Sequence, residues 1–227
     1  MATLPTLISD LRDLTRTTST DLTDARGTRY LNRAMERMQD AHNWRGQEFS
    51  LTTVTYGPSD DGIALPADFI SEEALWRQMP SVSNPSGKLR PVDKLPARRD
   101  WWQRVLKTHP PNEQRFPASS TAVDDGPYYY LWEQKLFYNP NPNQAVNLTL
   151  DYYRRLADLA LTTNESNFFT VVTPTVLLWG ALPEAWAFLH EDERIGIAEA
   201  RFALLLGQAI KNDRQLAASG GPRSRGT

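Results

Sequence analysis

Histidine is the residue type in this sequence best suited to acid–base or metal chemistry, and its three copies stand apart from one another. His42, His109 and His190 fall at the ends of expected helices, and none has a second histidine three or four residues away. That spacing would place two metal ligands on one face of a helix. A lone histidine at a helix end more commonly interacts with the last free carbonyl groups. We therefore expect no metal site, and the lack of cysteine excludes thiolate ligands and disulfides.

Paired carboxylates are the second candidate for chemistry, because glycoside hydrolysis needs two of them across a sugar. Adjacent acidic residues occur at Asp60-Asp61, Asp124-Asp125 and Glu191-Asp192-Glu193. These pairs lie in expected turns or at a helix start, where carboxylates are solvated or cap the helix. The sequence also has no nucleophile elbow, no phosphate-binding loop and no dinucleotide-binding glycine motif. We expect no catalytic residue and no cofactor, and predict that the protein is not an enzyme.

Two segments rich in aromatic side chains are better suited to binding a partner. Arginine and tryptophan alternate in ARRDWWQRVLK, a pattern that could stack on a nucleic acid strand but is equally enriched at protein interfaces. Asp100 interrupts the positive charge, which favours a protein partner. The strand YYYLW adds further aromatic side chains. The candidate interface residues of the two segments are Arg98, Arg99, Trp101, Trp102, Arg104, Tyr128, Tyr130 and Trp132.

The overall charge and hydropathy limit the partners further. A net charge of −2 argues against holding nucleic acid by neutralising phosphates. Charges at Asp10, Arg12 and Asp13 interrupt the N-terminal segment, so it lacks the apolar core of a secretory signal. No stretch approaches the ~20 apolar residues that span a bilayer. We expect a soluble protein that does not contact a membrane.

The elements that would position these residues follow from apolar spacing. Helical periodicity occurs near both ends of the chain, over residues 4–14, 21–43, 173–189 and 191–214, with Pro183 expected to kink the third helix. Between them, short runs of alternating or β-branched residues separated by turns predict strands, with one short helix near 97–107. The meander of strands after residue 128 is expected to be antiparallel.

These elements predict an α+β fold that is mainly α. We expect a four-helix bundle formed by the N- and C-terminal helix pairs, with a long antiparallel β-rich insertion between them. The expected parts are the N-terminal helix pair (1–45), the insertion (46–160), the C-terminal helix pair (161–217) and a flexible tail (218–227).

The succession of segments resembles the head-to-tail adaptor proteins of tailed bacteriophages over most of the chain. The segments that carry the resemblance are YLNRAMERMQDAHNW, LPADF, YYYLWEQKLFYNPNP, LTLDYYRRL and LLWGALPEAWAFLHEDER. The resemblance implies a structural subunit of the virion neck, in a homo-oligomeric ring, commonly dodecameric, between the portal protein and a tail nozzle or tail-tube protein. Genomic DNA would pass through such a ring without specific binding.

Three other functions remain open at the level of the sequence. The first is another neck or tail component, such as a head-completion or tail-terminator protein. The second is a phage glycosidase that uses one of the carboxylate pairs, and the third is a cellular interaction module. Position next to portal and capsid genes would favour the adaptor.

Overall fold

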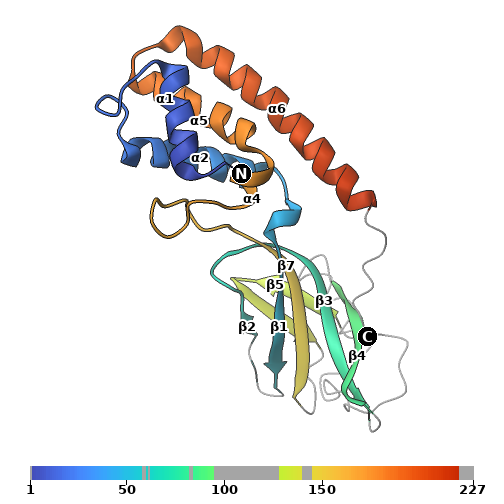
Figure 1. Cartoon of the computed structure of the whole chain (residues 1–227). Coiled ribbons are helices and arrows are strands. Elements are labelled where there is room, and N and C mark those ends of the chain that lie inside the picture. Colours follow the sequence, from blue (N-terminus) through green and yellow to red (C-terminus); the bar gives the residue numbers. More distant parts are fainter. Residues whose placement is uncertain are drawn as a thin grey trace. The chain divides into compact units, whose positions relative to one another are not determined.

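The chain forms two compact units, a helical unit made from both ends of the sequence and a sheet unit made from its middle. A computed structural model describes residues 2–57, 60, 62–81, 84–94, 128–139 and 145–219 (Figure 1). The helical unit extends to Gln47 and resumes at Arg155, and the sheet unit comprises the residues between them. The short helix expected near 97–107 lies outside the described residues.

Two helices of the helical unit begin at residues whose side chains cap them. Thr23 accepts a hydrogen bond from the backbone N–H of Arg26, and Asn167 forms a reciprocal capping box with Thr170. A single 3-10 turn, η1, lies at Arg45–Gln47. The α-helices are α1 (Leu4–Thr15), α2 (Asp24–Ala41), α4 (Phe168–Val172), α5 (Pro174–Phe188) and α6 (Asp192–Ser219).

Helix α5 lies at the centre of the helical unit and packs against α1, α2, α4 and α6. Its buried residues occur around its whole circumference, and the helix continues through Pro183. Gly180 allows a close approach of its neighbours, because a Cβ there would lie 2.8 Å from Phe202 and 3.0 Å from Ala34. A helix that is apolar on all sides must be covered by its neighbours on all sides.

The expected four-helix bundle is therefore wrong. In a bundle each helix contributes one apolar stripe to a shared core and keeps a polar face in solvent. Here the described residues form five α-helices, and α5 has no polar face of this kind.

The described residues of the sheet unit form a seven-stranded sheet with the order β1-β7-β3-β4-β5-β6-β2. The expectation of a wholly antiparallel insertion is also wrong, because β4 and β5 pair in parallel at Asp93–Tyr128 and Lys94–Tyr129. Parallel neighbours need a long crossover, and a long segment separates these two strands. The strands are β1 (Glu48–Tyr56), β2 (Ile63–Ala64), β3 (Phe69–Ser81), β4 (Asn84–Lys94), β5 (Tyr128–Trp132), β6 (Lys135–Asn139) and β7 (Val146–Arg154).

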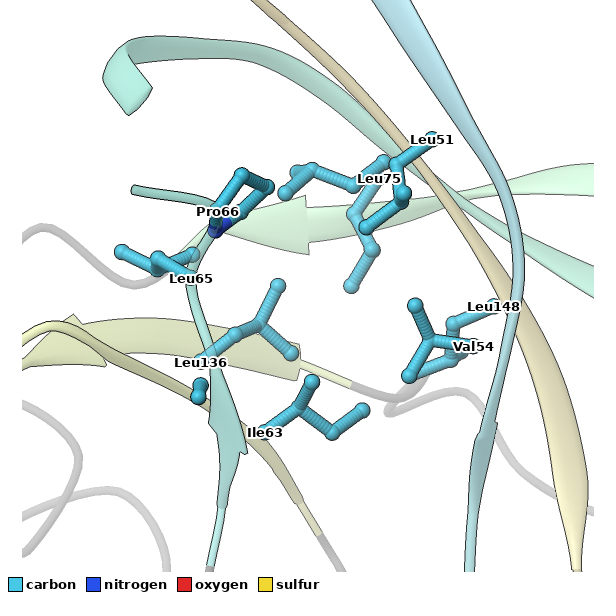
Figure 2. Close-up of a pocket in the computed structure, with 10 residues that line it drawn as sticks. Leu51, Val54, Ile63, Leu65, Pro66, Leu75, Leu136 and Leu148 are labelled. Carbon is cyan, nitrogen blue, oxygen red and sulfur yellow. The ribbon is translucent and has the colours of Figure 1, made fainter. Parts of the chain in front are cut away.

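The inner face of this curled sheet has its own apolar core. Along β7, the side chains of Leu148 and Leu150 are buried, whereas the preceding Asn147 is exposed. This alternation is typical of a strand with one covered face. Side chains from both edge strands meet there, since Val54 of β1 and Ile63 of β2 line the same small cavity (Figure 2). Its volume is about 10 Å³, so the inside of the sheet is filled by its own side chains.

Candidate interaction surfaces

The strand β5 carries the part of the predicted interface that the structure describes. Tyr128, Tyr130 and Trp132 alternate with the buried Tyr129 and therefore share one face of the strand. The other predicted residues, Arg98, Arg99, Trp101, Trp102 and Arg104, lie outside the described residues. Their role at an interface remains a prediction.

Local contacts hold the β5 aromatic side chains in place. The ring of Tyr130 stacks on Phe137 of β6, with centroids 4.9 Å apart and planes 5° from parallel. Trp132 is 44% exposed and precedes a two-residue turn in which Glu133 and Gln134 both have positive φ. That turn type matches the twist of a hairpin and fixes its register. The face is therefore presented by a rigid hairpin, which lowers the entropic cost of binding.

A polar groove runs along α2 beside the segment that follows β7. It has a volume of about 520 Å³, and ion pairs form its sides. Arg33 pairs with Glu184 at 2.5 Å, and Arg155 reaches Glu36. The residues lining the groove are Ala25, Thr28, Arg29, Asn32, Arg33, Glu36, Gln39, Arg155 and Asp158.

Backbone hydrogen bonds to two α2 side chains fix the far wall of this groove. Asn32 accepts from the N–H of Leu159 at 2.8 Å and donates to its carbonyl oxygen at 3.1 Å. The side-chain oxygen of Gln39 accepts from the N–H of Leu156 at 2.7 Å. Thr28, which also lines the groove, has a buried hydroxyl oxygen without a hydrogen-bond partner among the described residues. The hydrogen bonds to Asn32 and Gln39 therefore fix the shape of the groove.

The outer face of α6 exposes large apolar side chains. Its inner face is buried through Ala198 and Phe202. On the opposite side, Ile197 is 66% exposed and Leu204 is 55% exposed, one heptad apart. Gly207 lies on the same side, and a Cβ placed there would meet no atom within 4 Å. The side chains of Ile197 and Leu204 are exposed and have the spacing of a seam that packs against another helix.

Comparison with known protein families shows the family to which the chain belongs. The family model described as SU10 adaptor protein matches residues 2–226, nearly the whole chain. The chain belongs to the SU10 adaptor protein family. The predicted resemblance to the head-to-tail adaptors of bacteriophages is thereby confirmed at the level of the family. No curated protein matches the chain.

Membership of the SU10 adaptor family identifies a structural phage protein that acts in tail assembly. In the part of the chain that the structure describes, no three His, Asp or Glu side chains gather as a metal site would require. Of the adjacent carboxylates, Asp61 lies outside that part, and so does the whole pair Asp124-Asp125. None of the helices that the structure describes combines the length and hydropathy needed to cross a membrane.

The histidines of the SU10 adaptor protein take different roles in the fold. His42 follows α2, and its Nε2 lies 3.2 Å from Oδ2 of Asp213 on α6. Arg45 donates to Oδ1 of the same carboxylate at 3.0 Å. Asp213 is only 6% exposed and joins the last turns of α6 to the residues before β1. His190 adopts a positive φ of 58° between α5 and α6, and His109 lies outside the described residues.

Burial alters the acidity of the tyrosines inside the sheet of the adaptor. Burial, together with a 3.0 Å hydrogen bond to Asp68, raises the pKa of Tyr152 to about 12. Burial also raises the pKa of Tyr138, an effect that the nearby Arg77 partly opposes. These hydroxyls are therefore neutral at physiological pH and serve the core of the sheet.

Sequence reasoning missed both the groove and the outer face of α6. The groove depends on pairs such as Asn32 and Leu159 that are distant in the sequence, and no local pattern signals them. The α6 face had a signal, because Ile197 and Leu204 do not fit the apolar stripe formed by Ala198, Phe202 and Leu205. An amphipathic helix with apolar residues on a second side indicates a second contact.

Proposed function

We propose that this SU10 adaptor protein is a head-to-tail adaptor whose copies form a dodecameric ring between the portal protein and the tail. The observation that carries the proposal is the family match over residues 2–226. In this role the protein is a component of the virion neck, made in the host cytoplasm, and has no catalytic function.

The surfaces described above suit a subunit with several protein neighbours. A closed ring of more than two copies needs heterologous contacts, so each subunit must present two different patches. The charged groove along α2 and the aromatic face of β5 differ in chemistry and belong to different units of the chain. Each is built from side chains held by hydrogen bonds or ring stacking, as a preorganised interface requires.

The charge of the chain suits the passage of DNA through the ring. With a net charge of −2 per copy, a ring carries no excess of positive charge that would hold phosphates. We expect the lumen to lack a continuous basic stripe. A reconstruction of the ring by electron microscopy tests this directly, and a lumen lined by Lys and Arg would contradict it.

Assembly on the portal is the decisive experiment. Purified full-length chain is mixed with portal rings of the same phage and with its tail-tube or tail-nozzle protein, and the products are imaged by electron microscopy. An adaptor forms a second ring stacked on the portal, and the tail protein binds only after that ring is present. A ring that binds the tail protein but never the portal would instead identify a tail-terminator protein.

A further inference from the structure

The residues along the outer face of α6 form a pattern that complements itself. Ile197, Leu204 and Lys211 recur every seven residues, and Glu193, Ala200 and Gly207 form a second series offset by four positions. All six residues are exposed. The two series correspond to the a and d positions of a coiled-coil seam, which packs against another helix.

An antiparallel second copy of α6 matches this seam in both size and charge. If the two antiparallel helices are centred at the level of Phe202 along their axes, Ile197 of one copy faces Gly207 of the other, and Leu204 faces Ala200. A large side chain then meets a small one at each apolar layer. At both ends Glu193 faces Lys211, so opposite charges meet.

The parallel arrangement lacks these matches. It places each residue opposite itself, so Glu193 would face Glu193 and Lys211 would face Lys211 in the partner copy. Like charges at both ends oppose that register. Ile197 and Leu204 would also each meet their own equivalent, so large side chains would face large ones. The small residues Ala200 and Gly207 would likewise each face their own equivalent.

We propose that the unassembled protein forms a dimer through antiparallel pairing of α6 from two copies. Such a contact is isologous, because the same face is used by both subunits. It cannot be the repeating contact of a cyclic ring, so it goes beyond the proposed function and describes the protein before it joins a ring. The pairing covers the exposed Ile197 and Leu204 until assembly.

Cysteine crosslinking tests both the contact and its direction, because the natural chain contains no cysteine. Antiparallel pairing brings Ala203 close to Ala203 of the second copy, so Ala203→Cys is expected to crosslink with a short bismaleimide. It separates the two copies of Ala218 by about 48 Å along the helix, at 1.5 Å per residue, so Ala218→Cys should remain uncrosslinked. Efficient crosslinking at both positions would establish a parallel pair and overturn the proposal, as would crosslinking at neither.

Charge exchange provides an independent test by sedimentation equilibrium. Glu193→Lys and Lys211→Glu should each weaken dimerisation by about tenfold or more, since each places like charges at both ends of the seam. The double variant, and a mixture of the two single variants, should regain the dimer. Recovery in neither case would refute the pairing of these residues.

Ile197→Asp has a matched control in Val172→Asp, because Val172 is 54% exposed on α4 and lies outside the seam. Only Ile197→Asp should give a monomer, with unchanged far-ultraviolet circular dichroism. If the natural chain is monomeric but Ile197→Asp fails to stack on portal rings, the seam belongs to the portal and the dimer is wrong. If the natural chain dimerises but never binds the portal, the proposed function fails and this inference stands.

Discussion

The buried side chains of Gln39 and Gln47 are joined by a hydrogen bond, with Nε2 of Gln47 3.3 Å from Oε1 of Gln39. The same oxygen accepts from the backbone N–H of Leu156 at 2.7 Å. One side chain of α2 therefore holds the chain both where it leaves the helical unit and where it returns.

Removing this side chain should destabilise the helical unit. Gln39→Ala removes the oxygen that accepts from the N–H of Leu156 and from the amide of Gln47, at a cost of about 1–3 kcal/mol in the free energy of unfolding. Chemical denaturation followed by circular dichroism measures the loss. The exposed Gln208→Ala serves as the control and should change stability by less than about 0.5 kcal/mol. Equal effects of the two variants would mean that the Gln39 contacts contribute nothing.

Two glycines are expected to respond in opposite directions to the same substitution. Gly180→Ala should destabilise the protein by about 1–3 kcal/mol, because the new Cβ would lie 2.8 Å from Phe202. Gly207→Ala should stabilise the monomer by up to about 1 kcal/mol, because alanine is the better helix former and the position is open. Thermal denaturation of both variants checks the signs. A neutral Gly180→Ala would show that Phe202 shifts without cost.

The acidity of Tyr152 gives a prediction for alkaline pH. Its pKa is raised from 10.0 to about 12 in the folded state, so the folded protein keeps this proton more tightly than the unfolded chain does. The resulting stabilisation is complete below pH 10 and is lost as the pH rises towards 12. Ultraviolet titration of tyrosinate should show a late-titrating group, and Asp68→Asn should lower its pKa. A pKa that does not change in Asp68→Asn would exclude the hydrogen bond as a cause.

The carboxylate of Asp213 is expected to hold the end of α6 in place. Asp213→Ala removes the acceptor for His42 and Arg45, and we expect a loss of about 1–3 kcal/mol. Hydrogen exchange should accelerate in the last turns of α6 and around η1, while α1 keeps its protection. The neighbouring Asn212→Ala, at an exposed position, is the matched control. Uniform acceleration across the helical unit would argue against a local clamp.

Trp132 is expected to contribute to binding and little to folding. Because it is 44% exposed on β5, Trp132→Ala should lower the affinity for a neck partner by about tenfold or more. The free energy of unfolding should change by less than about 1 kcal/mol. Tail-protein and portal binding assays identify which partner is affected. Unchanged binding to both would remove Trp132 from the interface.

The sequence indicated the elements of the fold better than their arrangement. Alternation along β7 and helical spacing in α1 and α2 are local properties, and they were enough to predict those elements. The bundle prediction is wrong because a helix of a four-helix bundle keeps one polar face, whereas the buried residues of α5 occur around its whole circumference. The parallel pairing of β4 with β5 depends on a distant partner, so no local pattern could reveal it.

Among the candidate interaction surfaces, only those with a pattern visible within one segment of the sequence could be predicted. The aromatic alternation of Tyr128, Tyr130 and Trp132 is visible in the sequence, and the structure places the three side chains on one face of β5. The contact between Gln39 and Leu156 joins residues 117 positions apart. Such contacts arise from tertiary packing, and the local patterns of a single sequence do not predict them.

The shared anchor at Gln39 also bears on how such proteins diversify. The side-chain oxygen of Gln39 binds the chain both where it enters the sheet unit and where it leaves it. The segment between these two points can therefore be lengthened, shortened or exchanged by recombination without a change in the packing of the helices. Both ends of the sheet unit are thus held at a single contact, so a different middle segment can be accepted while the helical unit keeps its packing.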